Sequence, residues 1–194
     1  MVIKKAEIKY KDKWLKKKWI PIKPPVFLGN EIIGHTVFMK NKSPLGRITH
    51  TSLGTLTKNV RDHNVTLKFK LNEISEGNIC MTKYMGQEIN KNQIMMAVRR
   101  GSSRIDNIEI LKFDNEKIRI KTVLITTNRV STAVMHSLRA KVKKEIQKEC
   151  SSSKTIENFL PSVNAGKLQA EIVRRVKTIY PCREMIVRKI EVIA

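Results

Sequence analysis

Aromatic residues, paired cysteines and long apolar runs are all scarce in this 194-residue sequence. Aromatics make up 5% of the chain, too few for a surface that binds by stacking many bases. The three cysteines, Cys80, Cys150 and Cys182, are widely spaced and form no C-x-x-C pair, which argues against a disulfide framework and a zinc ribbon. Apolar runs such as 94–98 are far shorter than a membrane span, and none follows the first lysines. We therefore expect a protein of the reducing cytoplasm that is neither exported nor embedded in a membrane.

Motifs for catalysis or metal binding are also lacking. The four histidines, His35, His50, His63 and His136, are scattered and have no partner at the spacing that a metal or nucleophilic site requires. The stretch GNEIIGHT at 29–36 has the glycine spacing of a phosphate-binding loop. However, His35 replaces the lysine that reaches the phosphates, and two isoleucines stand where backbone amides must approach them. We predict an ordinary turn here, no catalytic residue, no metal and no cofactor.

Negative charge is the third scarcity. The chain has 17 Asp and Glu against 39 Lys and Arg, which gives a net charge of +22. Such an excess opposes compaction by self-repulsion and favours a polyanionic partner. Nucleic acid, an anionic membrane and an acidic protein remain as partner classes. With 41% hydrophobic residues, the chain can bury about two thirds of its unfolded surface, so one compact domain is expected.

The first 24 residues are predicted to form a basic arm. Residues 1–23 contain nine lysines and two acids with little apolar periodicity, so this segment cannot fold alone. The prolines at 24–25 impose extended geometry and mark the boundary with the domain. Arm lysines neutralise phosphates without reading sequence, and Trp14 is a candidate for stacking on an unpaired base. Trp19, which stands beside two isoleucines, is interpreted as a pin that holds the arm on the domain.

Alternation of apolar and polar residues predicts several strands. The best signal is 64–71, where four apolar side chains face one way and two lysines and a threonine the other. Short turns pair the strands into two hairpins, with a short helix at 90–100 between them. Strands joined in this way imply an antiparallel sheet or barrel. The predicted strands are 46–53, 64–71, 78–86, 105–113 and 117–125.

The C-terminal third changes to a helical period. Apolar residues recur every four positions from Val130 to Ile146, and six bases against two acids lie in 129–149. Because so few acids are available for i,i+4 pairing, this basic surface favours a polyanion. Nucleic acid is preferred to membrane, since the apolar side lacks large aromatics. Another helix begins near Leu168 and must end before Pro181, and a final strand follows.

Three arginines and two serines surround a glycine in the segment 99–104. Their guanidinium groups are suited to grip phosphates through paired hydrogen bonds. The alternative is a solvated helix end whose cations interact with the helix dipole. The net charge of the chain favours phosphate contact.

Six stretches occur in a characteristic order: KKKWIPIKPP at 16–25, GRITHTSLGTL at 46–56, VTLKFKL at 65–71, RRGSSRID at 99–106, LITTNRVSTAVMHSLRAKVKKEI at 124–146 and KTIYPCREMIVRKIEV at 177–192. This set covers nearly the whole chain and resembles the archaeal and eukaryotic small-subunit ribosomal protein family S-one-e, also called S-three-A-e, which is distinct from the bacterial S-one protein. The sequence departs from the family pattern at 125–127 and 131–134. It lacks the extended C-terminal tail of eukaryotic members, so the likeness is closer to the short archaeal form.

The resemblance implies a structural ribosomal protein with a central antiparallel β-barrel, flanking helices and a basic N-terminal arm threaded into rRNA. Family members sit on the platform of the small subunit near the mRNA exit. There they touch the 3′ region of the small-subunit rRNA and neighbouring ribosomal proteins. The expected partners are therefore small-subunit rRNA, those proteins and mRNA near the exit site, with no membrane and no homo-oligomer.

We therefore expect an α+β fold, an antiparallel β-barrel core with flanking helices and a basic, extended N-terminal arm. The arm is 1–24, and one domain covers 25–194, with 25–127 mainly barrel and 128–194 helices plus a final strand. The expected function is that of a structural constituent of the small ribosomal subunit, cytoplasmic and ribosome-bound, that binds rRNA and performs no chemistry. The alternatives are a free RNA-binding or RNA-processing factor and, less favoured, a nucleotide phosphohydrolase. The expected rRNA-binding residues are Lys13, Trp14, Lys16, Lys17, Lys18, Trp19, Arg99, Arg100, Arg104, Arg129, Arg139, Lys143, Lys144, Arg183, Arg188 and Lys189.

Overall fold

The computed structural model describes residues 17–29, 31–39, 43–75, 78–113, 116–153 and 155–193. The strands are β1 (Lys18–Lys23), β2 (Gly34–Phe38), β3 (Ile48–Ser52), β4 (Val65–Ser75), β5 (Ile79–Ile89), β6 (Arg104–Lys112), β7 (Lys117–Thr126) and β8 (Cys182–Ile193). The helices are α2 (Leu53–Thr57), α3 (Lys91–Ala97), α4 (Thr132–Ser153), α5 (Ile156–Asn164) and α6 (Lys167–Val176), with 3₁₀ turns η1 (Val26–Leu28) and η2 (Val60–Asn64). The fold is α+β, as predicted.

One sheet contains all the described strands. Its order is β2-β1-β5-β8-β7-β6, with β4 also paired to β5 and β3 to β4. Within the described residues no pairing joins the outer strands to one another, so the sheet is open and a closed barrel is not confirmed. Across the gap between β2 and β3, the Arg47 guanidinium donates to Thr36 Oγ1 and to the Val37 carbonyl, each at 3.1 Å. The Arg47 side chain thus connects the neighbourhood of β3 to β2, at the place where main-chain pairing of β2 with β3 would close a barrel.

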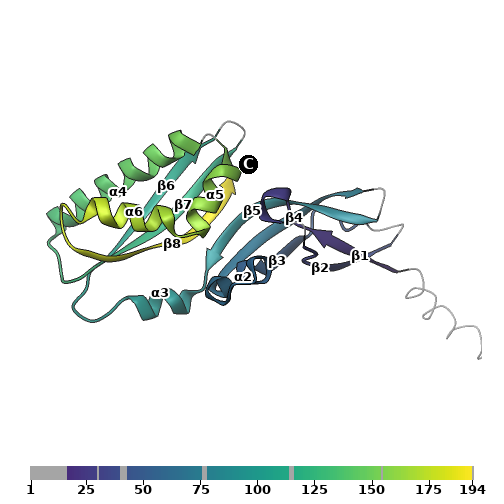
Figure 1. The fold of residues 1–194 in the computed structure, drawn as a ribbon, viewed down its shortest axis with the longest axis horizontal. Helices are drawn as coiled ribbons and strands as arrows, with labels where there is room; N and C mark the ends of the chain where they lie inside the picture. Colours follow the sequence, from purple (N-terminus) through teal and green to yellow (C-terminus); the bar gives the residue numbers. More distant parts are fainter. Residues whose placement is uncertain are drawn as a thin grey trace, which may run out of the picture.

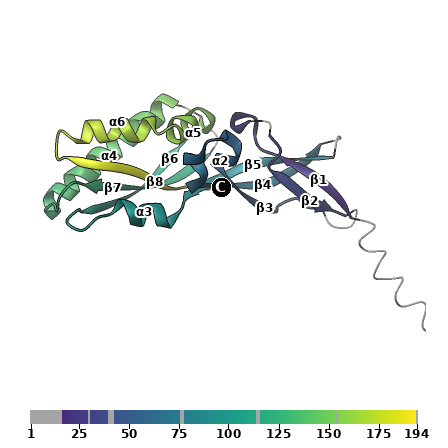
Figure 2. The same cartoon turned by 60° about the horizontal axis from the view of Figure 1, so that its bottom comes forward.

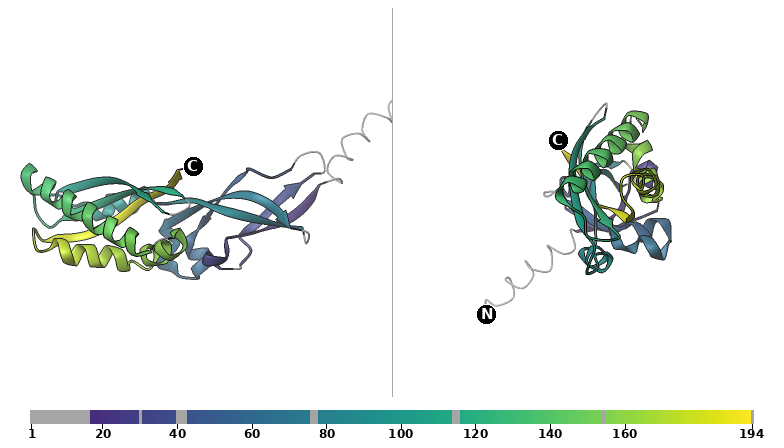
Figure 3. Two further views of the ribbon diagram at one scale, coloured as in Figure 1. Left: turned by 90° about the horizontal axis from the view of Figure 1, so that it is seen from above. Right: turned by 90° about the vertical axis from the view of Figure 1, so that its left-hand side faces the viewer.

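The molecule is elongated and has two halves that follow one another along its long axis (Figures 1 and 3). Strands β1 to β5 form the N-terminal half, and β6 to β8 with α4, α5 and α6 form the C-terminal half. Strand β5 links the two halves. One edge of β5 pairs along its whole length with β4, and the other edge pairs first with β1 of the N-terminal half and then with β8 of the C-terminal half. The contact with β8 covers only three positions, Gly86, Gln87 and Glu88. Gly86 has φ +149°, and a Cβ there would overlap the Ile190 carbonyl oxygen, so glycine permits the close approach of the two strands.

Helices α4, α5 and α6 cover one face of the C-terminal strands, and α3 lies against the opposite face (Figure 2). The four-residue repeat of α4 buries Leu138, Val142 and Ile146, which confirms the predicted stripe. The alternation of β4 buries Leu67 and Phe69 in the same core cluster. The core therefore lies mainly between the sheet and its helical layer.

A smaller core holds β1 in the N-terminal half. Ile20 and Ile22 pack with Leu71 and Cys80, whereas Trp19 points to the other face and is 67% exposed. The interpretation of Trp19 as a pin is therefore wrong, because strand alternation gives that role to the isoleucines. Residues 18–23 of the predicted arm are a sheet strand. Residues 1–16 lie outside the described residues, and the division into arm and domain stays a prediction.

The predicted strands and both C-terminal helices are confirmed, with shifts at their ends. The helix predicted at 90–100 is the shorter α3, whose Asn90 side chain accepts from the Asn92 amide at 3.2 Å. The stretch 29–36 leads into β2 and not into a helix, so it lacks the helix N-terminus of a phosphate-binding loop. The pattern missed α5, which contains Pro161 in its interior.

Candidate nucleic-acid interface

Three loops meet at the end of the C-terminal half opposite β1 (Figure 1). We call this region the three-loop end; its loops are 98–103 between α3 and β6, 127–131 between β7 and α4, and 177–181 between α6 and β8. The loops are far apart in sequence. Because β6, β7 and β8 are neighbouring antiparallel strands, the start of β6, the end of β7 and the start of β8 lie at the same end of the sheet. The sheet topology therefore builds this surface.

Main-chain and hydroxyl hydrogen bonds tie the three loops together. The Ser103 amide donates to Thr126 Oγ1 at 3.0 Å, and the Thr126 amide donates to the Ser103 carbonyl at 3.0 Å. The Val130 amide donates to Ser103 Oγ at 3.1 Å. The Thr127 amide donates to the Pro181 carbonyl at 3.2 Å. Since Thr126 is fully buried, this network fixes the positions of all three loops.

Five exposed cations belong to this end. Within the described residues none of them forms an ion pair with an acid. They come from all three loops and from the start of β8, so they present free N–H donors beside exposed loop hydroxyls. Such a group can neutralise several phosphates of one polyanion. The five residues are Arg99, Arg100, Arg129, Lys177 and Arg183.

Lys177 was missed by the sequence analysis. It follows α6 and begins the stretch 177–192, but no charge pattern singles it out there, and it joins the other cations only through the fold. Its position is also evident in the pKa of the Cys182 thiol, which burial raises and the Lys177 ammonium lowers in part. Only the topology of the sheet could have revealed this residue.

Arg104 stands beside the three-loop end but is already paired. Its guanidinium donates to both Asp106 carboxylate oxygens, at 2.8 and 2.7 Å. This bidentate contact raises the pKa of Arg104. Its charge is therefore partly neutralised within the chain, although it remains exposed.

The basic surface of α4 is less free than its sequence suggests. Lys143 pairs with Glu109 of β6 at 3.4 Å, and Lys141 pairs with Glu145 at 3.7 Å. Glu109 thus supplies from another element a partner that the helix sequence lacks, whereas Glu145 lies on α4 itself. Lys144 is exposed and has no ion pair among the described residues, while Arg139 is half-buried and likewise unpaired there.

Besides Arg183, the last strand contributes one paired and one unpaired cation. Lys189 lies 2.6 Å from Glu191 and 3.7 Å from Glu88, and the hydrogen bond with Glu191 raises the pKa of Lys189. The same contact lowers the pKa of Glu191. Arg188 is half-buried and has no ion pair in the described part of the chain.

The remaining predicted residues lie at the other end of the molecule or outside the described ranges. Lys18 and Trp19 are exposed on β1, and Lys17 precedes them. Lys13, Trp14 and Lys16 lie outside the described residues. The predicted residues thus form no single patch, since the two ends of the sheet separate them (Figure 3).

No catalytic constellation is present in the described ranges. Ser52 Oγ lies 3.1 Å from His63 Nδ1, but this hydroxyl also accepts from the Gly54 amide and caps α2. Asp62 accepts from Thr57 Oγ1 at 3.1 Å. No described cluster of His, Cys, Asp and Glu could hold a metal ion, and no described helix has the length and hydropathy to cross a membrane.

An α+β scaffold whose loops gather cations without ion pairs in the described residues defines a basic protein suited to a polyanionic partner. The chain belongs to the ribosomal S3Ae family, which matches residues 5–194. Its relatives include the small ribosomal subunit protein eS1 of Archaeoglobus fulgidus, 32% identical over 197 residues that cover 100% of this chain and 92% of the relative. The proteins of the same name from Methanopyrus kandleri (29% identical, 94% and 88% covered) and Staphylothermus marinus (32%, 92% and 84%) are also similar. The resemblance predicted from the sequence is confirmed, and membership of a ribosomal protein family gives the chain a structural role in translation and not an enzymatic one.

Proposed function

We propose that the chain is a structural constituent of the small ribosomal subunit and binds rRNA by phosphate contacts from the three-loop end. The observation that supports this is the gathering of five exposed cations without acidic partners from four separate segments of the described chain. Phosphate contacts position a protein on RNA without reading sequence. The family relationship makes rRNA the polyanion to which these cations are matched.

The other predicted contacts complete the proposal. The predicted arm, 1–24, contributes rRNA contacts in this proposal, although its residues 18–23 belong to the sheet as β1; Lys18 and Trp19 are exposed on that strand. The chain is cytoplasmic and ribosome-bound, and its partners are small-subunit rRNA, neighbouring ribosomal proteins and mRNA near the exit site. A free RNA-binding or RNA-processing factor would use the same surface.

The salt dependence of RNA binding tests the phosphate contacts. If six to ten phosphates are contacted, affinity should fall by roughly a thousandfold or more between 50 and 200 mM salt. The triple variant Arg100→Ala, Arg129→Ala, Lys177→Ala should flatten the slope of log K against log salt by roughly 2 to 3, because each lost phosphate contact removes about 0.7 to 0.9. The control is Lys58→Ala, which removes an exposed lysine already paired with Glu31 at 2.6 Å. An unchanged slope in the triple variant would refute the assignment.

Sedimentation separates the two candidate functions. The wild-type chain should migrate with small subunits and remain there at moderate salt. Recovery only in fractions free of ribosomes would favour the free RNA-binding factor.

A further inference from the structure

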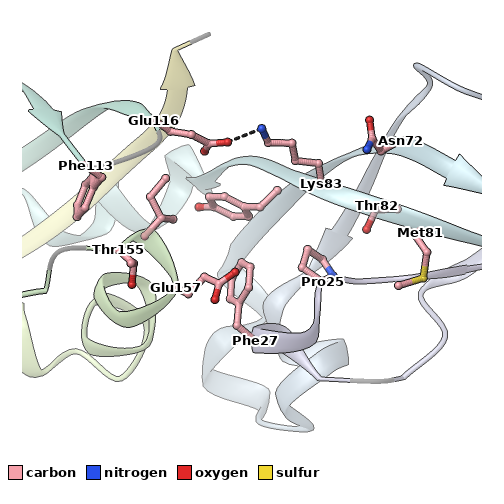
Figure 4. Close-up of a pocket in the computed structure, with 12 residues that line it drawn as sticks. Pro25, Phe27, Asn72, Met81, Thr82, Lys83, Phe113, Glu116, Thr155 and Glu157 are labelled. Carbon is pink, nitrogen blue, oxygen red and sulfur yellow. Dashed lines mark ion pairs between the residues drawn. The ribbon is translucent and has the colours of Figure 1, made fainter.

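A pocket of about 430 Å³ lies where the two halves of the molecule meet (Figure 4). Its walls come from η1, β4, β5, the hairpin between β6 and β7, and the start of α5. Phe27, Met81, Tyr84, Phe113 and Ile156 make much of its lining apolar. The pocket is thus formed by both halves and lies away from the three-loop end.

The aromatic part of the lining is held by ring contacts. Phe27 and Phe69 each make an edge contact with the Tyr84 ring, with centroids 6.2 and 6.4 Å away. Tyr84 is 4% exposed, and its hydroxyl has no hydrogen-bond partner among the described residues. Burial raises the pKa of this phenol, so it stays protonated and remains a donor. Because the hydroxyl itself is buried, Tyr84 contributes ring surface to the pocket and no accessible polar group.

The charged residues that line the pocket are unusual for this chain. They are Lys83, Glu116 and Glu157, and Lys83 pairs with Glu116 at the rim (Figure 4). Glu157 has no basic partner within the described ranges. The rim thus carries a carboxylate excess on a protein of net charge +22. A phosphate would be repelled here, whereas a cationic group would be attracted.

We propose that this pocket receives a large apolar side chain from a lysine- or arginine-rich segment of a neighbouring protein in the small subunit. The proposal rests on the proposed function. The apolar lining takes the side chain, and Glu157 faces the cations that flank it. The pocket is a protein contact, in contrast to the three-loop end, which is an RNA contact.

Photo-crosslinking in assembled small subunits distinguishes the two kinds of contact. Thr155 is a suitable position for a photoreactive amino acid, because its side chain is exposed, lines the pocket and makes no capping bond to α5. The expected adduct is a protein adduct that maps to a basic segment with a large apolar residue. An adduct to RNA, an adduct to residues 1–16 of the same chain, or no adduct at all would overturn the proposal.

A second crosslinking position keeps the two proposals separable. Asn128 is exposed in loop 127–131, and a photoreactive residue there should give an RNA adduct. If Asn128 gives an RNA adduct and Thr155 does too, the pocket proposal fails while the proposed function stands. If the chain never assembles into small subunits, the proposed function fails.

Two substitutions test the chemistry of the pocket. Tyr84→Phe removes only the buried, unpaired hydroxyl and keeps the ring, so the free protein should keep or increase its stability and the yield of the Thr155 adduct should equal that of the wild type. Glu157→Lys should lower that yield by about 5-fold or more, because it places like charge against the segment. The matched control is Glu149→Lys, the same charge change on α4 outside the pocket lining, which should leave the yield unchanged. Equal yields for the wild type and Glu157→Lys would overturn the proposal.

Discussion

Replacing Gly86 with alanine should weaken the junction between the two halves of the molecule. Gly86 has φ +149°, which an L-residue adopts only with strain of about 1–3 kcal/mol. The added Cβ would also overlap the Ile190 carbonyl oxygen, a main-chain atom that cannot rotate away. Strands β5 and β8 must therefore move apart at one of their three paired positions.

The cost follows from these two effects. Separation weakens about one or two ladder hydrogen bonds, each worth about 1 kcal/mol net. Together with the strain, the expected loss in the free energy of unfolding is about 2–5 kcal/mol. Typical domains are stable by about 5–15 kcal/mol, so this single methyl group would remove a large share.

Urea denaturation followed by circular dichroism measures the effect. The control is Gly34→Ala on β2, where no atom lies within 4 Å of the added Cβ and φ is not positive, so the change should stay within about 0.5 kcal/mol. Hydrogen exchange should show earlier opening of β5 and β8 in Gly86→Ala. A free energy of unfolding equal to the wild type within about 0.5 kcal/mol would refute the reasoning.

Further predictions concern other contacts. Ile20→Ala should lower the free energy of unfolding by about 2–5 kcal/mol because it leaves a cavity in the small core, whereas Trp19→Ala should lower it by about 0.5 kcal/mol or less. Urea denaturation compares the two variants. Equal losses would contradict the assignment of Ile20 to the core and of Trp19 to the surface. Gly54→Ala should destabilise by about 1–3 kcal/mol, since its Cβ would lie 2.8 Å from a main-chain oxygen, and unchanged thermal unfolding would disprove this. The hydrogen bond from Arg175 lowers the pKa of Glu145, so this pair stabilises the fold above the ordinary glutamate pKa of 4.5 and loses that effect as the pH falls through the lowered value. Glu145→Gln should therefore destabilise at pH 7, with the difference from wild type narrowing below pH 4.5; a difference independent of pH would count against the pair.

Local patterns predicted the local structure. Alternation found β4 and its partner β5 because each strand has one face on the core, and the four-residue repeat found α4 for the same reason. Helix α5 was not predicted because it is short and Pro161 interrupts its pattern. Its buried face is formed by Phe159, Leu160 and Val163. Tertiary packing here overrides a local signal that opposes a helix.

Contacts between distant segments could not be predicted in this way. The sequence identified 99–104 and the basic helix as separate candidates, but no pattern brings Arg129, Lys177 and Arg183 to one end of the sheet. That requires the strand order β6-β7-β8. Partners in other elements were equally hidden, as in the pairing of Lys143 with Glu109. The sequence analysis therefore overestimated how many basic side chains of α4 are without an acidic partner.

Strand β5 joins the two halves through its contact with β8, and β4 lies beside it along its whole length. The β4–β5 ladder meets the C-terminal part of β8, and β8 continues from there to the three-loop end (Figure 1). Any force between partners bound at the two extremities would therefore pass through the three paired positions that join β5 to β8.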